Sequence, residues 1–486
     1  MISLLYRVDK QKNSISKDTV SELMLDKIIS CFTLNKNSQK YFIDVLYTPL
    51  TNESDIKYRQ TVLSDLIRNK YIVLQLYDLF TRFDELYEEY AEAKRKSARM
   101  NSSNDINTAV FHLNSIAFTL KKILLLLKEV ATTVDGCSFT SEGMTRLCSR
   151  IKEILETDVY TELTEITSAF ENYSICGKSI NIVATINSYG KLNCIDLSPI
   201  LESSSKNNEA KHTFKPFKKK KFLMDSSVII ENNFLGTQFL ISAIKTNIAA
   251  MEFAVKSIIG EFGNLGKELV FYSVAVRYSL MLNNSLGNIT FPVFGDDVDI
   301  CGLCDMYLMF SSYHKSGVVP NDYKMDKNIK GIIIEGDNNC GKTVYLRSFV
   351  TAVIFAQAGL PIAATSAKLS IYKNIHVLMA SAEKYSGVSN NYGGFEEEVC
   401  AVEEIVNSAE KGSLVVFNEV FQTTDYTEGA EGLYNILNYF SNCNIKWVLV
   451  THLKRLSVIC ESDDNIAKLH TSKEEKYKII GYNKCI

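Results

Sequence analysis

The sequence is poor in the residues that interrupt helices. Among 486 residues there are only 6 prolines. Tryptophan is also rare, with a single residue. Scarce proline favours long helices, because proline removes a backbone donor and clashes with the preceding turn. The 12 cysteines have no regular spacing, and the N-terminus lacks the basic-then-apolar pattern of a secretory signal. We therefore expect reduced thiols and a cytoplasmic protein.

Strong net charge and long apolar runs are also missing. The formal net charge is -3, so any contact with nucleic acid must come from a local basic patch. No run reaches the ~18 uninterrupted apolar residues that a membrane-spanning helix needs, so we expect no contact with a membrane. With 46% hydrophobic residues the chain can bury a substantial core. Its length predicts about three domain-sized units.

Helical periodicity dominates the first part of the chain. Apolar residues recur every three or four positions, and this predicts long helices over the ranges 56–94, 107–133, 141–172 and, with a break near 260–266, 233–282. Pro49 interrupts the pattern. We accordingly predict an N-terminal helical segment at 1–48 and a helical core domain at 49–286.

An insert at about 178–222 departs from this helical pattern. Residues 179–185 and 192–197 alternate in the β manner around a turn, which predicts a hairpin. A polar stretch follows and ends in five lysines with phenylalanines between them: Lys215, Lys218, Lys219, Lys220 and Lys221. These lysines can contact a phosphate backbone. A solvated surface loop explains them equally well.

The last part of the chain, residues 287–486, is predicted to form one domain. Residues 287–330 are rich in Gly, Asp and Asn with short apolar runs, and from there to about residue 460 short apolar strands alternate with helices. This order is typical of a parallel sheet with crossover helices. The predicted fold class is therefore α + α/β: an all-helical body with a small β insert, followed by an α/β domain.

One strand-to-helix junction in this domain carries a phosphate-binding motif. The apolar run 331–334 leads into G-x-x-x-x-G-K-T and then a helix that starts at Val344. In this context backbone amides cradle phosphates, the lysine reaches the β- and γ-phosphates, and the threonine ligates Mg²⁺. The predicted nucleotide-binding residues are Gly336, Asp337, Asn338, Asn339, Cys340, Gly341, Lys342, Thr343 and Val344.

Two later strands end in residues that complete such a site. The apolar run 413–417 ends in Asn418 and Glu419, and the run 445–450 is followed by Thr451 and His452. Glu419 is placed to activate the attacking water, and His452 to sense the γ-phosphate. Asn418 stands where an aspartate normally helps to hold Mg²⁺, so metal binding or turnover is expected to be weaker.

These segments together resemble the MutS family of ATPases. Tyr345, Leu346 and Arg347 follow the phosphate loop as in that family, and Asn321 with Asp322 looks like its segment near the nucleotide base. The resemblance implies a P-loop domain of the ABC type, with ATP and Mg²⁺ as cofactors. It also implies DNA as a partner, bound by structure rather than sequence, and a homodimer that forms on ATP binding.

The chain also departs from the family pattern. Gly393 and Gly394 stand where the family has a serine that reaches the γ-phosphate of the partner subunit. The lever-like segment begins by residue 49, so we expect no mismatch-reading domain, and the chain ends before the family's C-terminal extension.

Three functions remain open at this point. The first is an ATP-driven switch that binds DNA; the second is a nucleotide-gated scaffold with weak or no hydrolysis, which Asn418 and Gly393 favour. A small-molecule kinase would leave the helical body without a purpose. Cys301 and Cys304 form half of a possible zinc site, but no second pair accompanies them.

Overall fold

The computed structural model describes residues 2–7, 15, 17–33, 35–100, 106–170, 180–186, 192–199, 234–311, 317–379, 394–421, 426–471 and 477–481. Contacts divide the chain into two compact units. The helical unit comprises Met1–Ser3, Leu74–Cys137 and Thr145–Lys267, and the sheet unit comprises Leu4–Val73, Ser138–Met144 and Glu268–Ile486. Each unit is described by itself. The domain boundaries proposed from the sequence stay predictions.

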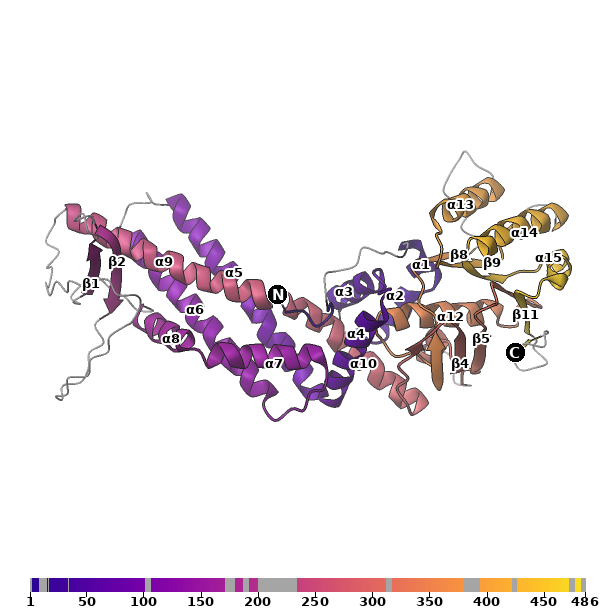
Figure 1. The fold of residues 1–486 in the computed structure, drawn as a ribbon, viewed down its shortest axis with the longest axis horizontal. Helices are drawn as coiled ribbons and strands as arrows, with labels where there is room; N and C mark the ends of the chain where they lie inside the picture. The colour runs from indigo at the N-terminus through magenta and orange to yellow at the C-terminus, as the bar shows by residue number, and fades with distance from the viewer. Residues whose placement is uncertain are drawn as a thin grey trace. The chain divides into compact units, whose positions relative to one another are not determined.

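The helical unit is built from long helices, as the periodicity predicted. Its elements are α5 (Lys70–Met100), α6 (Ile106–Val134), α7 (Glu142–Leu155), α8 (Asp158–Phe170), α9 (Phe234–Phe262) and the antiparallel strands β1 (Ile180–Ile186) and β2 (Leu192–Pro199). The predicted hairpin strands are thus confirmed. The turn between them and the five lysines of the insert lie outside the described residues. α6 packs against both α8 and α9 (Figure 1).

α6 combines length with an apolar composition. Within the described part of the chain it is the one helix whose length and composition would suit a membrane span. Half of its most apolar window is nevertheless buried inside the protein. Its apolar residues, such as Leu113, Leu120 and Leu127, are fully buried and form the core of the helical unit.

One predicted helix is interrupted at a position where the periodicity indicated no break. The range 56–94 forms two helices, α4 (Glu53–Arg68) and α5, with Asn69 between them. The backbone N–H of Asn69 donates to the Asp65 carbonyl at 3.0 Å, and its side-chain amide donates to the same carbonyl at 2.9 Å. Asn69 therefore ends α4 by satisfying a terminal carbonyl.

The sheet unit contains the predicted parallel sheet. Its six strands run in the order β12-β11-β6-β10-β9-β8, and all neighbours are parallel except β12 with β11. The strands are β6 (Gly331–Gly336), β8 (Ile375–Met379), β9 (Leu414–Asn418), β10 (Lys446–Val450), β11 (Ile466–Thr471) and β12 (Ile479–Gly481).

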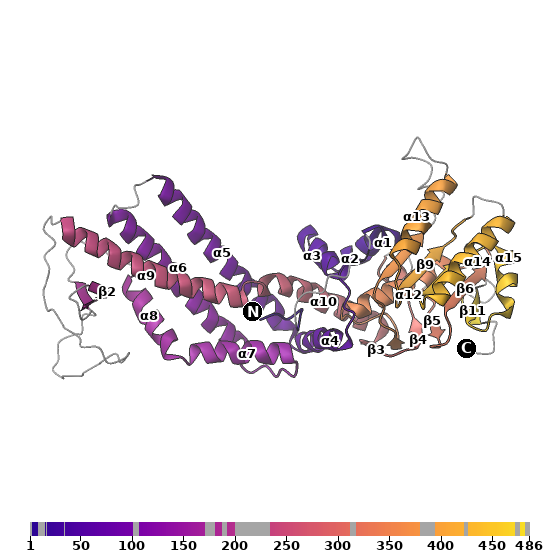
Figure 2. The ribbon, with the colours of Figure 1, turned by 45° about the horizontal axis from the view of Figure 1, so that its top comes forward.

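Helices cover the two faces of this sheet. Alternate residues Val415, Phe417, Trp447 and Leu449 form one core with α13 (Gly394–Ser408), α14 (Tyr426–Asn442) and α15 (Lys454–Ile459). α12 (Lys342–Gln357) contacts β6 and β10 and contributes no residue to that core. It therefore lies on the opposite face, as Figures 1 and 2 show. Since the strands are parallel, their C-terminal ends share one edge of the sheet.

A second sheet occupies a region whose structure the sequence left undefined. Its four strands run in the order β3-β7-β4-β5 and are β3 (Val293–Phe294), β4 (Val298–Leu303), β5 (Asn321–Met325) and β7 (Ser366–Leu369). The sheet unit also holds α1 (Lys17–Glu22), α2 (Leu25–Ser30), α3 (Lys36–Leu46), α10 (Leu265–Leu286) from Glu268 onward, and α11 (Met306–Phe310).

Candidate functional site

The phosphate loop adopts the strand–loop–helix arrangement that its motif requires. β6 ends at Gly336 and α12 begins at Lys342. Gly336 has a φ of 142°, and a Cβ on it would lie 2.3 Å from the carbonyl oxygen of Thr471. Only glycine fits there, because the β11 backbone approaches so closely. The first amides of α12 and its positive dipole end therefore face the loop, which suits an anion.

Lys342 lies over the loop and is almost completely buried. Its ammonium donates to the carbonyls of Gly336 at 2.9 Å and Asp337 at 2.8 Å. The side chain is therefore held at the concave side of the loop, where its charge adds to that of the amides. Cys340 is also buried, and its thiol contacts both the Asp337 carbonyl and the Thr471 hydroxyl. Cys340 thus closes the back of the loop against β11.

The C-terminal ends of β9 and β10 bring the predicted acidic and histidine side chains together. Nε2 of His452 lies 2.9 Å from Oε1 of Glu419, and both side chains are about one-third exposed, at 31% and 28%. Glu419 has a φ of 59°, in the left-handed region that glutamate rarely adopts. Its backbone N–H is fixed by the Val450 carbonyl at 2.8 Å. Backbone strain at such a position is typical of functional residues.

Asn418 contacts the threonine of the phosphate loop. The Thr343 hydroxyl donates to the Asn418 side-chain oxygen at 3.3 Å, and Asn418 is buried. These two oxygens are the hard, neutral donors that suit Mg²⁺. Within the described residues no group of three or more His, Cys, Asp or Glu side chains could hold a metal. Cys301 and Cys304 gain no further ligand there.

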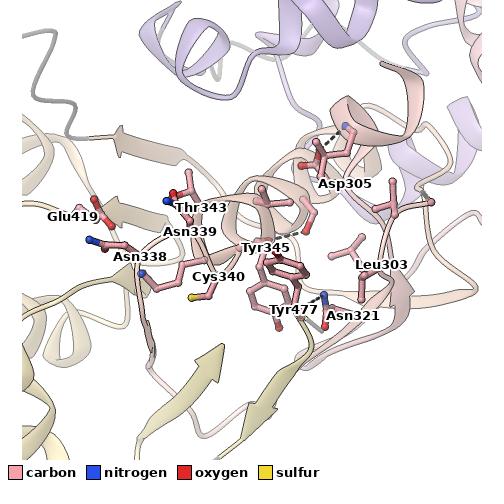
Figure 3. A pocket seen from close by; sticks show the side chains of 18 residues that line it. Leu303, Asp305, Asn321, Asn338, Asn339, Cys340, Thr343, Tyr345, Glu419 and Tyr477 are labelled. Atoms are coloured by element: carbon pink, nitrogen blue, oxygen red, sulfur yellow. Dashed lines mark hydrogen bonds between the residues drawn. The ribbon is translucent and has the colours of Figure 1, made fainter. Parts of the chain in front are cut away.

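A cavity of about 1050 Å³ joins the phosphate loop to a more apolar region. Glu419, Asn338 and Thr343 lie at one end, and Leu303, Asp305 and Asn321 lie at the other, with Tyr345 and Tyr477 between them (Figure 3). The remaining lining residues are Leu308, Gly317, Val318, Val319, Asn339, Cys340, Gly341, Lys342, Val344 and Ser348. The cavity is large enough for a nucleotide.

Asn321, expected near the nucleotide base, lines the cavity and also holds a distant segment of the chain. Its side-chain amide donates to the Tyr477 carbonyl at 3.3 Å, and its side-chain oxygen accepts from the Ile479 N–H at 2.9 Å. Both polar ends of Asn321 therefore hold the C-terminal segment beside the cavity. Tyr477 packs over Gly341 and is half exposed, at 47%. Tyr477 could not be predicted as a site residue, because nothing in the local sequence indicates that this segment returns to the phosphate loop.

A buried ion pair fixes the far wall of the cavity. Nε of Arg347 lies 2.9 Å from Oδ2 of Asp305, and NH2 of Arg347 lies 2.9 Å from Oδ1. Oδ1 of Asp305 also accepts the N–H of Leu308 at 2.9 Å and so caps α11. The bidentate geometry makes this contact specific to arginine. Arg347 in α12 thereby fixes the position of the wall relative to the phosphate loop.

Tyr345 adds a second link between α12 and this wall. Its hydroxyl donates to the Asp322 carbonyl at 2.9 Å, and its ring stacks on Tyr323. Burial raises the pKa of the Tyr345 hydroxyl well above its ordinary value, so the group stays a neutral donor.

Several predicted site residues lie elsewhere or outside the described residues. Asp337 is exposed beside the cavity rather than lining it. Gly394 is the first residue of α13, while Gly393 lies outside the described residues, as do the five lysines of the insert. The structure thus brings together Lys342, Thr343, Asn418, Glu419 and His452.

Comparisons with known proteins agree with this geometry. The family model described as MutS domain V matches residues 332–486, and the one described as MutS2 N-terminal domain matches residues 51–285. Between them the two models cover most of the chain.

Individual relatives match over shorter stretches. The Endonuclease MutS2 of Streptococcus agalactiae is 32% identical over 142 residues, which are 29% of this chain and 18% of that protein. The DNA mismatch repair protein MutS of Lactobacillus delbrueckii subsp. bulgaricus is 27% identical over 237 residues, 48% of this chain and 27% of that protein. The chain therefore spans only about a fifth to a quarter of the length of these relatives. With its phosphate loop, its Glu419–His452 pair and both family models in sequence order, the chain belongs to the MutS family.

Proposed function

We propose that this chain binds ATP with Mg²⁺ in the cavity and uses ATP hydrolysis to switch the way in which its helical body engages DNA. One observation carries the proposal: Lys342, Thr343 and Glu419 line one nucleotide-sized cavity although they follow different strands, and His452, which follows a third strand, contacts Glu419. Each of these groups has a defined task in phosphoryl transfer.

The phosphate end of the cavity supplies charge and hydrogen bonds. The amides of the loop and of the first turn of α12 donate to the phosphate oxygens, and Lys342 exchanges its carbonyl partners for the β- and γ-phosphates. Thr343 and Asn418 would hold Mg²⁺, which would neutralise part of the phosphate charge when bound. Because Asn418 contributes no negative charge, we expect weaker metal binding than a carboxylate would give.

The water-activating end is formed by Glu419 and His452. Glu419 accepts a proton from the attacking water, and its contact with His452 at 2.9 Å keeps the carboxylate oriented. We assign His452 to the γ-phosphate because it contacts Glu419 and follows β10, which pairs with the strand β6 that leads into the loop. The nucleobase lies further along the cavity, from Tyr345 and Tyr477 toward Leu303 and Asn321.

The DNA part of the proposal rests on the relatives and on the basic insert. One relative is named a DNA mismatch repair protein and another an endonuclease, and the five lysines from Lys215 to Lys221 would bind phosphates without reading sequence. A second candidate function is a nucleotide-gated scaffold with little hydrolysis. It is favoured by Asn418 in contact with Thr343, where a carboxylate would strengthen metal binding.

Two variants test the site. Lys342→Ala should weaken ATP binding by about a hundredfold, because it removes charge-assisted hydrogen bonds worth ~1.5–3 kcal/mol each. Glu419→Gln should retain ATP binding but lose about a hundredfold or more of any turnover, since the amide is no base. Calorimetry measures the first effect, and phosphate release with and without branched or duplex DNA measures the second.

Lys330→Ala is the matched control for the lysine. Lys330 precedes the same strand at its other end and donates to the Asn444 side chain, so its loss should leave ATP affinity unchanged. DNA-stimulated turnover that disappears in Glu419→Gln would exclude the scaffold. An unmodified protein that takes up neither ATP nor ADP would refute both candidate functions.

A further inference from the structure

The C-terminal end of α12, opposite the phosphate loop, contacts a buried arginine. Arg59 lies in α4 and its side chain is completely buried, at 0% exposed. Its NH1 donates to the carbonyl of Ala358 at 3.0 Å, at the C-cap of α12. The negative end of the helix dipole is located there, so the guanidinium charge is favourable at this position. α12, which begins at the phosphate loop, thus ends in contact with α4.

The same guanidinium also holds the beginning of the chain. Nε and NH2 of Arg59 both donate to the Leu5 carbonyl at 3.2 Å. We call residues 4–6 the N-terminal strap. The strap is fixed from the other side by α10, where Glu268 accepts the N–H of Leu4 at 2.6 Å and Tyr272 donates to the Leu4 carbonyl at 2.5 Å. Leu4 and Leu5 are almost completely buried.

A second contact joins the last turn of α12 to Leu50, just before α4. The Gln357 side chain donates to the Leu50 carbonyl at 3.0 Å, and the Leu50 N–H donates to the Gln357 carbonyl at 3.0 Å. The same side chain exchanges two hydrogen bonds with the backbone of Tyr372. Gln357 is completely buried. The end of α12 is therefore held by a polar cluster in which each of these amide groups is paired.

Burying such a polar cluster in a core costs free energy, because its groups lose their contact with water. The guanidinium of Arg59 is flanked by the rings of Tyr6 at 5.4 Å and Phe271 at 5.6 Å. Burial lowers the pKa of Arg59, while nearby Tyr272, Tyr6 and Glu268 act to raise it. Apolar residues would often stabilise such a core at least as well. The forked donor provides geometry, because it fixes Leu5 and Ala358 relative to α4.

We infer that Arg59 is a positioning residue that couples the phosphate loop to α4: through the Ala358 carbonyl and the N-terminal strap, it makes α4 respond to nucleotide bound at the other end of α12. This inference rests on the proposed function, because it assumes that nucleotide binds at the loop. α12 is a rigid helix of 16 residues, about 24 Å long, so a shift at Lys342 moves its C-terminal end as well. α4 in turn is followed directly by α5, which enters the helical unit.

Hydrogen exchange on the full-length protein tests the coupling. Exchange is measured with and without the non-hydrolysable analogue AMP-PNP and Mg²⁺, on peptides from α12, from α4 and from the strap. In the unmodified protein we expect the nucleotide to slow exchange roughly tenfold in the loop and severalfold in α4 and the strap. In Arg59→Met the loop should keep its protection, and the effect on α4 and the strap should disappear. Each variant is compared with itself, so a general loss of stability does not imitate this result.

Lys57→Met is the matched control, because it removes a positive charge from the same helix, two residues away, at an exposed site paired only with Glu53 at the surface. It should leave the nucleotide response of α4 intact. Arg59→Lys, which keeps the charge but not the fork, should give a reduced response and serves if Arg59→Met fails to fold.

Three results would overturn the inference. The first is an α4 response that persists in both Arg59 variants. The second is an unmodified protein in which AMP-PNP protects the loop but never α4, and this leaves the proposed function standing. The third is an absence of protection anywhere, which refutes the proposed function and the inference together.

Discussion

At the scale of single residues, several polar side chains hold backbone groups in place by hydrogen bonds. Lys342 donates to two carbonyls, Asn321 bonds to two backbone groups of the C-terminal segment, and Arg59 donates to the carbonyls of Leu5 and Ala358. The contacts of Arg59 satisfy carbonyls that burial would otherwise leave without a partner. Such side chains decide where loops lie, and their loss should affect position as much as stability.

Asp65 gives a pH-dependent case of the same kind. Its side chain is fully buried and accepts the N–H groups of Thr140 at 2.9 Å and Ser141 at 2.7 Å, just before α7. Burial alone would raise the pKa of this carboxyl, but the hydrogen bonds from Ser141 and Thr140 are together stronger and lower it. The carboxylate therefore stabilises the fold at neutral pH.

The sign of the pH effect follows from this shift. A lowered folded-state pKa contributes stability above the ordinary aspartate pKa of about 4, and this stability is lost as the pH falls through the folded value. We expect Asp65→Asn to lower the free energy of unfolding by about 1–3 kcal/mol at pH 7, with a deficit that shrinks below about pH 4. Urea unfolding at pH 7, 4 and 3 measures it. Asp78→Asn, at an exposed site on α5, is the control, and a deficit that is equal at every pH would contradict the argument.

At the scale of elements, the pairing of β6 with β10 depends on one large and one absent side chain. Trp447 in β10 is fully buried, and its indole N–H donates to the Ser441 hydroxyl at 3.0 Å. A Cβ on Gly331, the first residue of β6, would lie 2.0 Å from the Trp447 ring. The indole thus occupies the space beside Gly331, so a side chain at the start of this strand would force the ring or the backbone to shift.

Gly331→Ala should therefore destabilise the sheet unit by about 2–3 kcal/mol through overpacking. Trp447 is the only tryptophan of the chain, so its fluorescence during urea unfolding reports on this sheet directly. Gly432→Ala in α14 is the matched control. A Cβ there meets nothing within 4 Å, and alanine should be neutral or stabilising by up to ~1 kcal/mol. Equal midpoints for Gly331→Ala and the unmodified protein would show that the ring can move aside.

At the scale of the whole molecule, the resemblance to the MutS family implies that two copies of the chain enclose ATP between their nucleotide domains. In that family the residue at the position of Gly393 and Gly394 reaches the γ-phosphate of the partner subunit, so we propose that this segment lies at the contact between the copies. α13 starts at Gly394, and its side chains Phe395 and Val399, one turn apart, are both exposed, at 41% and 38%. An apolar pair beside the predicted contact point suits an interface that forms only with nucleotide.

We therefore expect the Glu419→Gln variant to double its mass in solution on addition of ATP and Mg²⁺. Val399→Glu should abolish that doubling, because it places a charge in the contact, and should leave ATP affinity within about twofold. Val458→Glu on α15, which is 63% exposed, is the matched control and should dimerise normally. Light scattering with and without DNA gives the mass. A protein that stays monomeric under every condition would refute the expected homodimer.

The sequence by itself determined the phosphate loop, the helices α6 and α12, and the strands β6, β9 and β10, because local periodicity and a motif with fixed spacing encode them. It also indicated Glu419 and His452, since residues that follow parallel strands meet at one edge of a sheet. Only the tertiary structure decided which distant groups meet. Tyr477 beside Gly341, Asp305 paired with Arg347, and Arg59 between Leu5 and Ala358 join segments that lie far apart in the chain. The second sheet belongs to the same class, since its strands β3 and β7 pair although they lie far apart in the chain. Contacts of this kind depend on packing between elements, and no local pattern of residues records them.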